Sequence, residues 1–221
     1  MPRFQDRKIP DLAVPRLSHY YRALLESRET DVISSEELSR LTGYTAAQIR
    51  RDLACFGQFG TPGRGYAVSE LKGALLSILG IDKEWRVALV GAGNLGQALL
   101  GYKGFRDQGF KVLLAFDTDP HKVGQDIHGV CVYPLSELTQ RVAENDVRMA
   151  IVTVPAAVAQ NVVDQLIGAG VCAILNFVPT RLKVPAGITV QNIDMAIELE
   201  RLSYRTTRRP NGSRTDATTQ G

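Results

Sequence analysis

Several features that mark membrane, secreted or metal-binding proteins are scarce in this sequence of 221 residues. It contains no run of about 18 consecutive apolar residues, so no membrane-spanning helix is expected. The first ten residues, MPRFQDRKIP, lack the apolar core of a signal peptide, and we expect a cytoplasmic protein. Cys55, Cys131 and Cys172 are odd in number, widely spaced and form no CxxC, which indicates reduced thiols rather than a disulfide framework and predicts no metal site.

Charge is unevenly distributed around a mild net value of +3. Acidic residues are in excess between positions 81 and 200, whereas the stretch 201–221 has five basic residues and one acidic residue. Basic ends permit a polyanionic partner, but charge of this size also serves solubility alone. The composition therefore does not decide between these alternatives.

The first part of the chain has the signals of a helix-turn-helix. Apolar residues in VPRLSHYYRALLESRE follow helical spacing. Ser34 with Glu37 forms a capping-box pattern for a second helix, SSEELSRLTGY, which Gly43 ends. Thr45 is the expected N-cap of a third helix, TAAQIRRDLACFG, ending at Gly57. Two short helices joined by a glycine-containing turn predict the DNA-binding motif.

A glycine-rich segment then predicts a wing. QFGTPGRGYAV is expected to form a short hairpin with an exposed tip. The helix SELKGALLSILG follows, with Ser69 as its expected cap and Gly80 at its end. We therefore assign residues 1–82 to a winged-helix DNA-binding domain.

Residues 83–192 predict an α/β domain. Near-continuous apolar runs, typical of strands buried on both faces, alternate with helical segments. The expected strands are WRVALVG, KVLLAFD, VCVYP, RMAIVTVP and CAILNFVP. This alternation indicates a doubly wound, Rossmann-type parallel sheet. A final helix is expected within 193–205, and residues 206–221, which lack apolar periodicity, are expected to be a disordered tail.

The segment GAGNLG lies between a predicted strand and a predicted helix, the setting of a dinucleotide-binding loop. Gly91 permits the tight turn, Gly93 the approach of the pyrophosphate, and Gly96 close packing of helix on strand. Asp117 ends the next strand, where a carboxylate binds the ribose and favours NAD(H) over NADP(H). In the alternative, the glycines only make a turn and Asp117 is a cap.

Two further segments are expected beside the nicotinamide ring, TVPA from Thr153 and NFVP from Asn176. The complete set of predicted contacts to NADH and NAD⁺ is Gly91, Ala92, Gly93, Asn94, Leu95, Gly96, Asp117, Thr153, Val154, Pro155, Asn176 and Phe177.

A catalytic base is not evident. His19 lies in the first helix, and His121 and His128 follow Asp117 on the adenosine side. One doubly wound sheet uses the whole stretch from Trp85 to the last helix, which leaves no substrate domain. We predict no enzymatic activity, with a small NAD-dependent dehydrogenase as an alternative.

The third helix supplies the candidate DNA contacts. Its N-terminal turn would enter the major groove, with Thr45 as cap and Gln48, Arg50 and Arg51 directed outward. Gln can read adenine and Arg guanine. Arg64 at the wing tip could grip phosphate or the minor groove. An ordinary solvated basic face is the alternative.

The chain resembles the Rex family of redox-sensing transcriptional repressors over roughly residues 8–204. The motifs that carry the resemblance, in the family's order, are RLSHYYRAL, QIRRDLACFGQFG, GRGYAV, VGAGNLGQALLGYKGF, AFDTDPHKVGQDIHGV, VPAAVAQNVVDQL, ILNFVPTRLKVP and NIDMAIELERLSY. Ser18–His19, where less polar residues are expected, and Thr61–Pro62, where a basic wing residue is frequent, depart from the family pattern.

The resemblance implies a homodimer in which the C-terminal helix, about Asp194 to Tyr204, is exchanged between subunits. It implies that NADH closes the dimer and releases a double-stranded DNA operator, whereas NAD⁺ permits binding. Arg16, Tyr102 and Asp194 match positions that link the two domains in the family. Two alternatives remain. One is a regulator that binds another nucleotide, such as coenzyme A. The other is a redox switch at Cys55, although a buried structural cysteine is the simpler interpretation.

Overall fold

The computed structural model describes residues 13–28, 31–57, 59–60 and 64–208. The chain divides into two compact units, Met1–Glu84 and Trp85–Gly221. Each unit has its own hydrophobic core, and the two are described separately.

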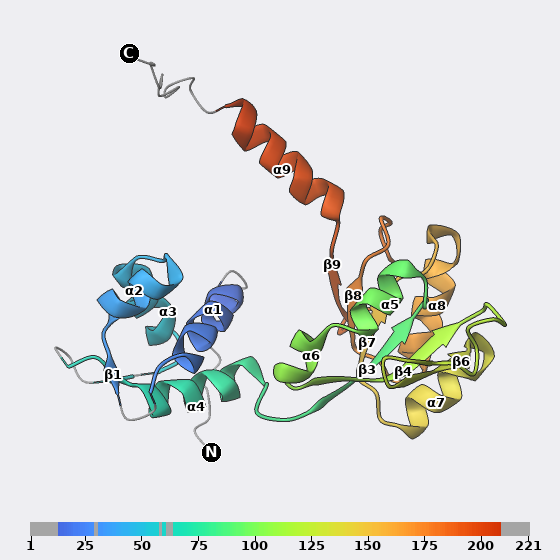
Figure 1. The fold of residues 1–221 in the computed structure, drawn as a ribbon, viewed down its shortest axis with the longest axis horizontal. Helices are drawn as coiled ribbons and strands as arrows, with labels where there is room; N and C mark the ends of the chain where they lie inside the picture. Colours follow the sequence, from blue (N-terminus) through green and yellow to red (C-terminus); the bar gives the residue numbers. More distant parts are fainter. Residues whose placement is uncertain (1–12, 29–30, 58, 61–63, 209–221) are drawn as a thin grey trace, which may run out of the picture. The chain divides into compact units, whose positions relative to one another are not determined.

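The first unit is helical. It contains the helices α1 (Ala13–Leu25), α2 (Ser35–Thr42), α3 (Ala46–Ala54) and α4 (Val68–Leu79), with the short antiparallel strands β1 (Val32–Ile33) and β2 (Tyr66–Ala67). The side chains of Leu17, Tyr20 and Leu24 in α1 pack with Ile49 and Leu53 of α3 in one fully buried cluster. The four helices lie together in this unit (Figure 1), and each contributes buried apolar side chains to one core.

The helix ends follow the predicted capping signals. Ser34 accepts a hydrogen bond from the backbone of Glu37, and the Glu37 carboxylate accepts one from the backbone of Ser34, so the capping box is complete. Gly43 ends α2 in the left-handed conformation at φ 76°. Thr45 caps α3 through the backbone N–H of Gln48 at 3.2 Å.

Two predicted boundaries are wrong. Helix α3 ends at Ala54 with Cys55 as its C-cap, rather than continuing to Gly57. Helix α4 begins at Val68, so Ser69 is not its cap. The backbone N–H of Val68 donates to the carbonyl of Asp31 at 3.0 Å and its side chain is fully buried, so tertiary contacts set the start of the helix.

The predicted hairpin also needs correction. Within the described residues, Tyr66–Ala67 pairs with Val32–Ile33, which precedes α2, and not with a strand of its own glycine-rich segment. Glycine is still required there, because a Cβ on Gly65 would lie 2.6 Å from the carbonyl oxygen of Ile33. Of the predicted wing, Thr61–Pro62 lie outside the described residues, whereas Arg64, the predicted tip residue, is described and exposed.

The second unit is built on a seven-stranded sheet in the order β5-β6-β4-β3-β7-β8-β9. All neighbouring strands are parallel except the short edge pair β5-β6. The strands are β3 (Trp85–Val90), β4 (Phe110–Asp117), β5 (Asp126–Ile127), β6 (Val130–Pro134), β7 (Met149–Val152), β8 (Ala173–Asn176) and β9 (Thr189–Asn192). Without β5, this is the strand order of a Rossmann fold, which reverses between β3 and β7.

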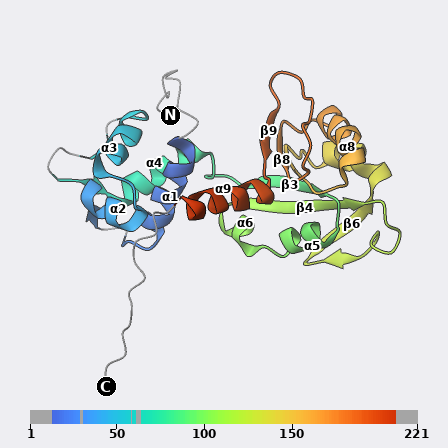
Figure 2. The ribbon, with the colours of Figure 1, turned by 90° about the horizontal axis from the view of Figure 1, so that it is seen from above.

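Helices cover both faces of the sheet. The helices α5 (Asn94–Leu100) and α6 (Lys103–Asp107) pack on one face, and α7 (Leu138–Glu144) and α8 (Ala156–Gly168) on the other. Figure 2 shows α5 and α8 on opposite sides of β3 and β4. The alternation of apolar strands and helices thus correctly predicts a doubly wound sheet.

Three features of this unit differ from the sequence prediction. The strands β5 and β9 were not predicted, because β5 is only two residues long and β9 is largely exposed. The helix after the glycine loop is divided at Gly101–Tyr102 into α5 and α6. Helix α9 (Met195–Thr207) continues past position 206, the expected start of the tail. The rest of that tail, 209–221, lies outside the described residues.

Helix α9 follows β9 (Figure 1), and none of its residues is buried in the described structure. Five large apolar side chains on it are at least half exposed: Met195, Ile197, Leu199, Leu202 and Tyr204. An apolar surface of this kind normally marks an interaction site. Within the part of the chain that the structure describes, no helix is both long enough and apolar enough to cross a membrane.

Candidate nucleotide site and nucleic-acid interface

The predicted nucleotide residues meet at one edge of the sheet. Those from Gly91 to Gly96 follow β3, Asp117 ends β4, those from Thr153 follow β7, and Asn176 ends β8. Since β3 and β7 are neighbours on either side of the point where the strand order reverses, these loops border the crevice where open α/β sheets bind ligands. The tertiary structure therefore brings together segments that are up to 85 residues apart, from Gly91 to Asn176.

Gly91 holds the turn that leaves β3. Its φ of 100° is unfavourable for a residue with a side chain. A Cβ at this position would also lie 2.8 Å from the carbonyl oxygen of Thr153. Its backbone N–H donates to the carbonyl of Phe116 at 2.8 Å, so this glycine joins the ends of β3, β4 and β7.

Gly93 and Gly96 have opposite surroundings. A Cβ on Gly93 would meet nothing within 4 Å, whereas one on Gly96 would collide with the carbonyl oxygen of Gly91 and lie 3.3 Å from Leu89. Gly93 is the N-cap of α5, and no side chain caps that helix. The loop therefore has open space at Gly93 and tight helix–strand packing at Gly96, as its two predicted roles require.

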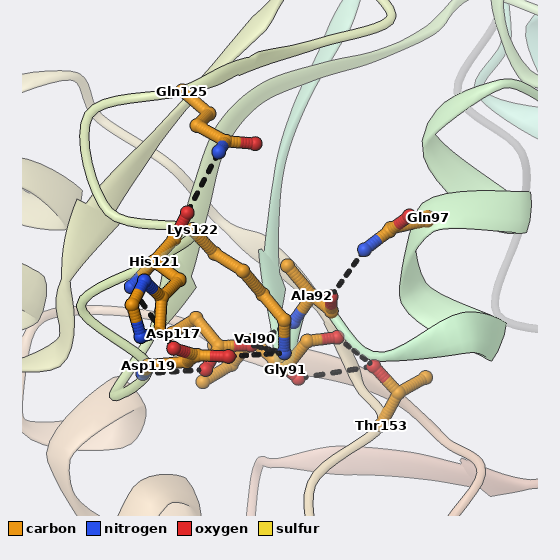
Figure 3. A network of polar contacts seen from close by, with 10 residues as sticks. All are labelled: Val90, Gly91, Ala92, Gln97, Asp117, Asp119, His121, Lys122, Gln125 and Thr153. Atoms are coloured by element: carbon orange, nitrogen blue, oxygen red, sulfur yellow. Dashed lines mark hydrogen bonds and ion pairs between the residues drawn. The ribbon is translucent and has the colours of Figure 1, made fainter.

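Two side chains fix the glycine loop in place (Figure 3). The hydroxyl of Thr153 donates to the carbonyl oxygens of Gly91 at 2.7 Å and Val90 at 3.2 Å. The amide of Gln97 donates to the carbonyl of Ala92 at 3.0 Å. The loop is thus held from β7 and from its own helix before any ligand is bound.

Asp117 lies beside the loop and is already engaged. One carboxylate oxygen accepts the backbone N–H of Ala92 at 2.7 Å, and the other accepts that of Asp119 at 2.9 Å. Lys122 lies 3.4 Å from both Asp117 and Asp119 (Figure 3). Burial lowers the pKa of Lys122, but the two carboxylates raise it more, so the ammonium stays charged. Asp117 therefore braces the loop in addition to its predicted contact with ribose.

The side chain of Asn176 is fully buried and hydrogen-bonded within the protein. Its amide nitrogen donates to the carbonyl of Val178 at 3.1 Å and to the side chain of Asn192 at 2.8 Å, and its oxygen accepts the backbone N–H of Val178 at 3.0 Å. It holds the turn after β8 and ties β8 to β9. Val154 and Phe177 beside it are half-buried and Pro155 is exposed, so the edge is mostly apolar there.

Four of the predicted DNA residues belong to α3 or its cap, namely Thr45, Gln48, Arg50 and Arg51, and Arg64 lies just before β2. Arg51 and Arg64 are exposed. Arg50 donates to the hydroxyl of Ser35 at 2.6 Å and to the carboxylate of Glu36 at 2.9 Å, so in this structure it crosses to α2. The half-buried side chain of Gln48 lies in the first turn of α3, where a recognition helix meets base edges.

The three residues that the resemblance associates with domain linkage are placed as follows. The guanidinium of Arg16 forms a two-bond ion pair with Asp52 in its own unit. Tyr102 is the N-cap residue of α6 and is 59% exposed. Asp194 caps α9 by accepting the backbone N–H groups of Ala196 at 2.9 Å and Ile197 at 3.3 Å.

Asp52 and Lys122 were not predicted from the sequence. A signal for Lys122 existed, since it follows the strand-end acid by five residues. Gln48 precedes Asp52 by four residues on one helix, a spacing that brings side chains together, but no local signal indicates Arg16 or Tyr20 as partners of Asp52. Cys55 is half-buried, not buried, and its thiol donates to the carbonyl of Arg51 at 3.3 Å. Among the described residues, no group of three or more His, Cys, Asp or Glu side chains could hold a metal ion.

Family models match both units. A model described as a putative DNA-binding protein N-terminus matches residues 8–54, and one described as a CoA binding domain matches residues 82–180. Each covers less than half of the chain. The first match lies within the first unit, and the second lies almost wholly within the second unit.

Relatives match most of the chain. A redox-sensing transcriptional repressor Rex from Syntrophomonas wolfei is 45% identical over 199 residues, which is 89% of this chain and 95% of the relative. The Rex of Streptomyces griseus is 40% identical and covers 94% of this chain and 83% of its own length.

Two solved structures of the protein RSP, described as a Rex-family repressor, are also similar. RSP in complex with beta-NAD⁺ and operator DNA aligns with a TM-score of 0.84 and 41% identity, covering 91% of this chain and 94% of RSP. RSP in complex with beta-NADH aligns with a TM-score of 0.80 and 37% identity, covering 91% and 96%.

These relatives are transcriptional repressors and not enzymes, which agrees with the prediction of no enzymatic activity. The identity extends across both units, so it covers the glycine loop as well as the helical domain. This chain therefore belongs to the Rex family of redox-sensing transcriptional repressors.

Proposed function

We propose that the chain binds NADH and NAD⁺ at the edge formed by Gly91–Gly96, Asp117 and Thr153, and operator DNA through α3. The observation that carries the proposal is the open space at Gly93 beside a braced loop at the reversal point of the sheet. The RSP complexes with both forms of the coenzyme and with operator DNA support it. A repressor acts on the chromosome, which supports the expected cytoplasmic location.

The two redox forms differ in charge at the nicotinamide ring, which is cationic in NAD⁺ and neutral in NADH. The segments expected beside the ring, 153–156 and 176–179, carry no charged side chain. An apolar, water-excluding surface disfavours the cation, because the ring would lose solvation without gaining a counter-charge. If this surface is complete only in a closed state, NADH stabilises closure more than NAD⁺ does.

The size of the required preference follows from a two-state equilibrium. Moving a population from 1:99 to 99:1 needs roughly a 10⁴-fold difference in affinity, or about 5.5 kcal/mol. Closure would change the separation of two recognition helices, whose half-sites lie one helical turn, about 34–36 Å, apart. NADH would then release DNA, and NAD⁺ would allow it to bind.

We also propose that the working form is a homodimer with α9 exchanged between subunits. The exposed apolar side chains of α9, Leu199 and Leu202 among them, support this, because burial in a second subunit would remove them from water. Arg16, Tyr102 and Asp194 are proposed to link the DNA-binding and coenzyme-binding parts across that dimer.

A gel-shift titration tests the proposal. A palindromic operator, selected from a random duplex library with NAD⁺ present, is titrated with NADH, NAD⁺ and, separately, coenzyme A. Release by NADH alone supports the proposal. The match to a CoA binding domain favours coenzyme A as a second candidate ligand, so release by coenzyme A together with indifference to both nicotinamides would replace the first function by the second.

The assignment of Asp117 has its own test. Asp117→Ala removes both the brace on the glycine loop and the expected acceptor for ribose, so NADH affinity measured by calorimetry should fall. Glu144→Ala on α7 is a matched control, since it removes one exposed carboxylate from the same unit. Unchanged affinity in Asp117→Ala would remove this residue from the site.

A further inference from the structure

A buried carboxylate lies on the inner side of the proposed recognition helix. Asp52 in α3 is only 3% exposed. Its two oxygens accept four hydrogen bonds: from Arg16 Nε at 2.6 Å and Nη2 at 2.8 Å, from the Tyr20 hydroxyl at 2.8 Å, and from the amide nitrogen of Gln48 at 2.8 Å. Helix α1 therefore holds α3 through one charged group.

This carboxyl group remains ionised. Burial raises the pKa of Asp52, but the hydrogen bonds from Arg16, Tyr20 and Gln48 together lower the pKa by more than burial raises it, so the net shift is downward. An ionised carboxylate only accepts hydrogen bonds. The end of the Gln48 amide that faces inward must therefore be its NH₂ group, and the orientation of this amide is determined by chemistry.

Gln48 is held at two points. Its backbone N–H donates to the cap Thr45 at 3.2 Å, and its side-chain nitrogen donates to Asp52 at 2.8 Å. Within the described residues, no hydrogen bond uses its side-chain oxygen as acceptor. One amide N–H and that oxygen thus remain for a base, and a Gln side chain binds adenine in the major groove through such a donor–acceptor pair.

We propose that Asp52 is a positioning residue for operator reading, which orients the Gln48 amide from behind and so sets the base that the first turn of α3 prefers. This inference rests on the proposed DNA-binding function of α3. Asp52 itself does not touch DNA. It holds the flexible Gln48 side chain in its base-reading conformation before DNA binds. The entropy cost of ordering that side chain is then not charged against binding.

The test compares discrimination with affinity. Wild type, Gln48→Ala, Asp52→Asn and the double variant are titrated by fluorescence anisotropy against the selected operator and against duplexes with each half-site base pair changed singly. Asp31→Asn is the matched control, because it removes the same charge from an exposed side chain of the same unit. Circular dichroism checks that each variant is folded.

Gln48→Ala should lose discrimination at one base pair, by roughly 5- to 150-fold. Asp52→Asn should lose discrimination at that same base pair, and the double variant should lose no more than Gln48→Ala alone. Asp31→Asn should keep the wild-type profile. A uniform loss of affinity in Asp52→Asn, with the profile intact, is the result of a purely structural role and would overturn the proposal, as would unchanged discrimination in Gln48→Ala.

Tyr20→Phe keeps the test decisive if Asp52→Asn does not fold. It removes one of the four donors to Asp52 and leaves the buried ring. It should reduce discrimination at the Gln48 base pair several-fold, and an unchanged profile would refute the role of Asp52. A wild-type protein that selects no operator at all would instead contradict the proposed DNA-binding function.

Discussion

A single methyl group added at Gly93 or at Gly96 should have opposite consequences, although the two positions are three residues apart. At Gly96 the new Cβ would collide with the carbonyl oxygen of Gly91 and lie 3.0 Å from its carbonyl carbon. These are backbone atoms in a turn that is held by hydrogen bonds, so displacing them would destabilise the fold. At Gly93 the Cβ enters open space, and the φ of −72° suits any residue.

The expected magnitudes follow from this geometry. Gly96→Ala overpacks the helix–strand contact and should destabilise the second unit by about 1–3 kcal/mol or more. For a unit of this size each kcal/mol lowers the Tm by roughly 3–6 °C. Gly93→Ala should leave the Tm of the free protein unchanged or slightly higher, since alanine restricts the unfolded chain.

Coenzyme binding should show the reverse dependence. If the pyrophosphate lies against Gly93, the methyl group of Gly93→Ala would occupy the ligand's place. NADH binding by this variant should then weaken by roughly 30- to 150-fold, equivalent to about 2–3 kcal/mol.

Differential scanning calorimetry gives the Tm, titration calorimetry gives the NADH affinity, and fluorescence of Trp85, the one tryptophan of the chain, reports on the second unit. Gly73→Ala in α4 is the control, because it adds the same methyl group to open space in the other unit. Wild-type NADH affinity in Gly93→Ala would refute the placement of the pyrophosphate, and an unchanged Tm in Gly96→Ala would refute the packing argument.

Three further outcomes are expected. Ser34→Ala removes the capping box of α2 and should cost about 1 kcal/mol of unfolding free energy in urea titrations, whereas an unchanged midpoint would show the cap to be idle. Folding lowers the pKa of Asp52. The ionised carboxylate therefore contributes to the free energy of unfolding above the unfolded pKa, near 4, and this contribution is lost as the pH falls through the lower folded pKa. Urea midpoints between pH 6 and pH 2 should therefore fall more steeply in wild type than in Asp52→Asn, and parallel curves would contradict this. Leu199→Asp with Leu202→Asp should convert the proposed dimer to monomer in analytical ultracentrifugation, and a stable dimer in that variant would exclude α9 from the interface.

Local signals in the sequence determined most of the elements and the glycine turn of the proposed nucleotide site. The caps at Ser34 and Thr45 act over three residues, so their pattern is visible in the sequence and correct in the structure. The requirements at Gly91 and Gly96 are equally local, since Gly91 makes a turn at positive φ and Gly96 a close approach of helix to strand, whereas the role of Gly93 stays a prediction. Alternation of apolar strands and helices was sufficient to predict the doubly wound sheet.

Only the tertiary structure decided which distant groups meet. Thr153 donates to Gly91 across 62 residues, and Arg16 pairs with Asp52 across 36. The strand β9 is largely exposed and has no strong apolar pattern. It forms because it pairs in parallel with the edge of β8. Such contacts depend on the burial and register of whole elements, which no short window of sequence contains. Residues close together in the sequence therefore determine the backbone turns of this protein, whereas the packing of whole elements determines which groups pair with its buried charges.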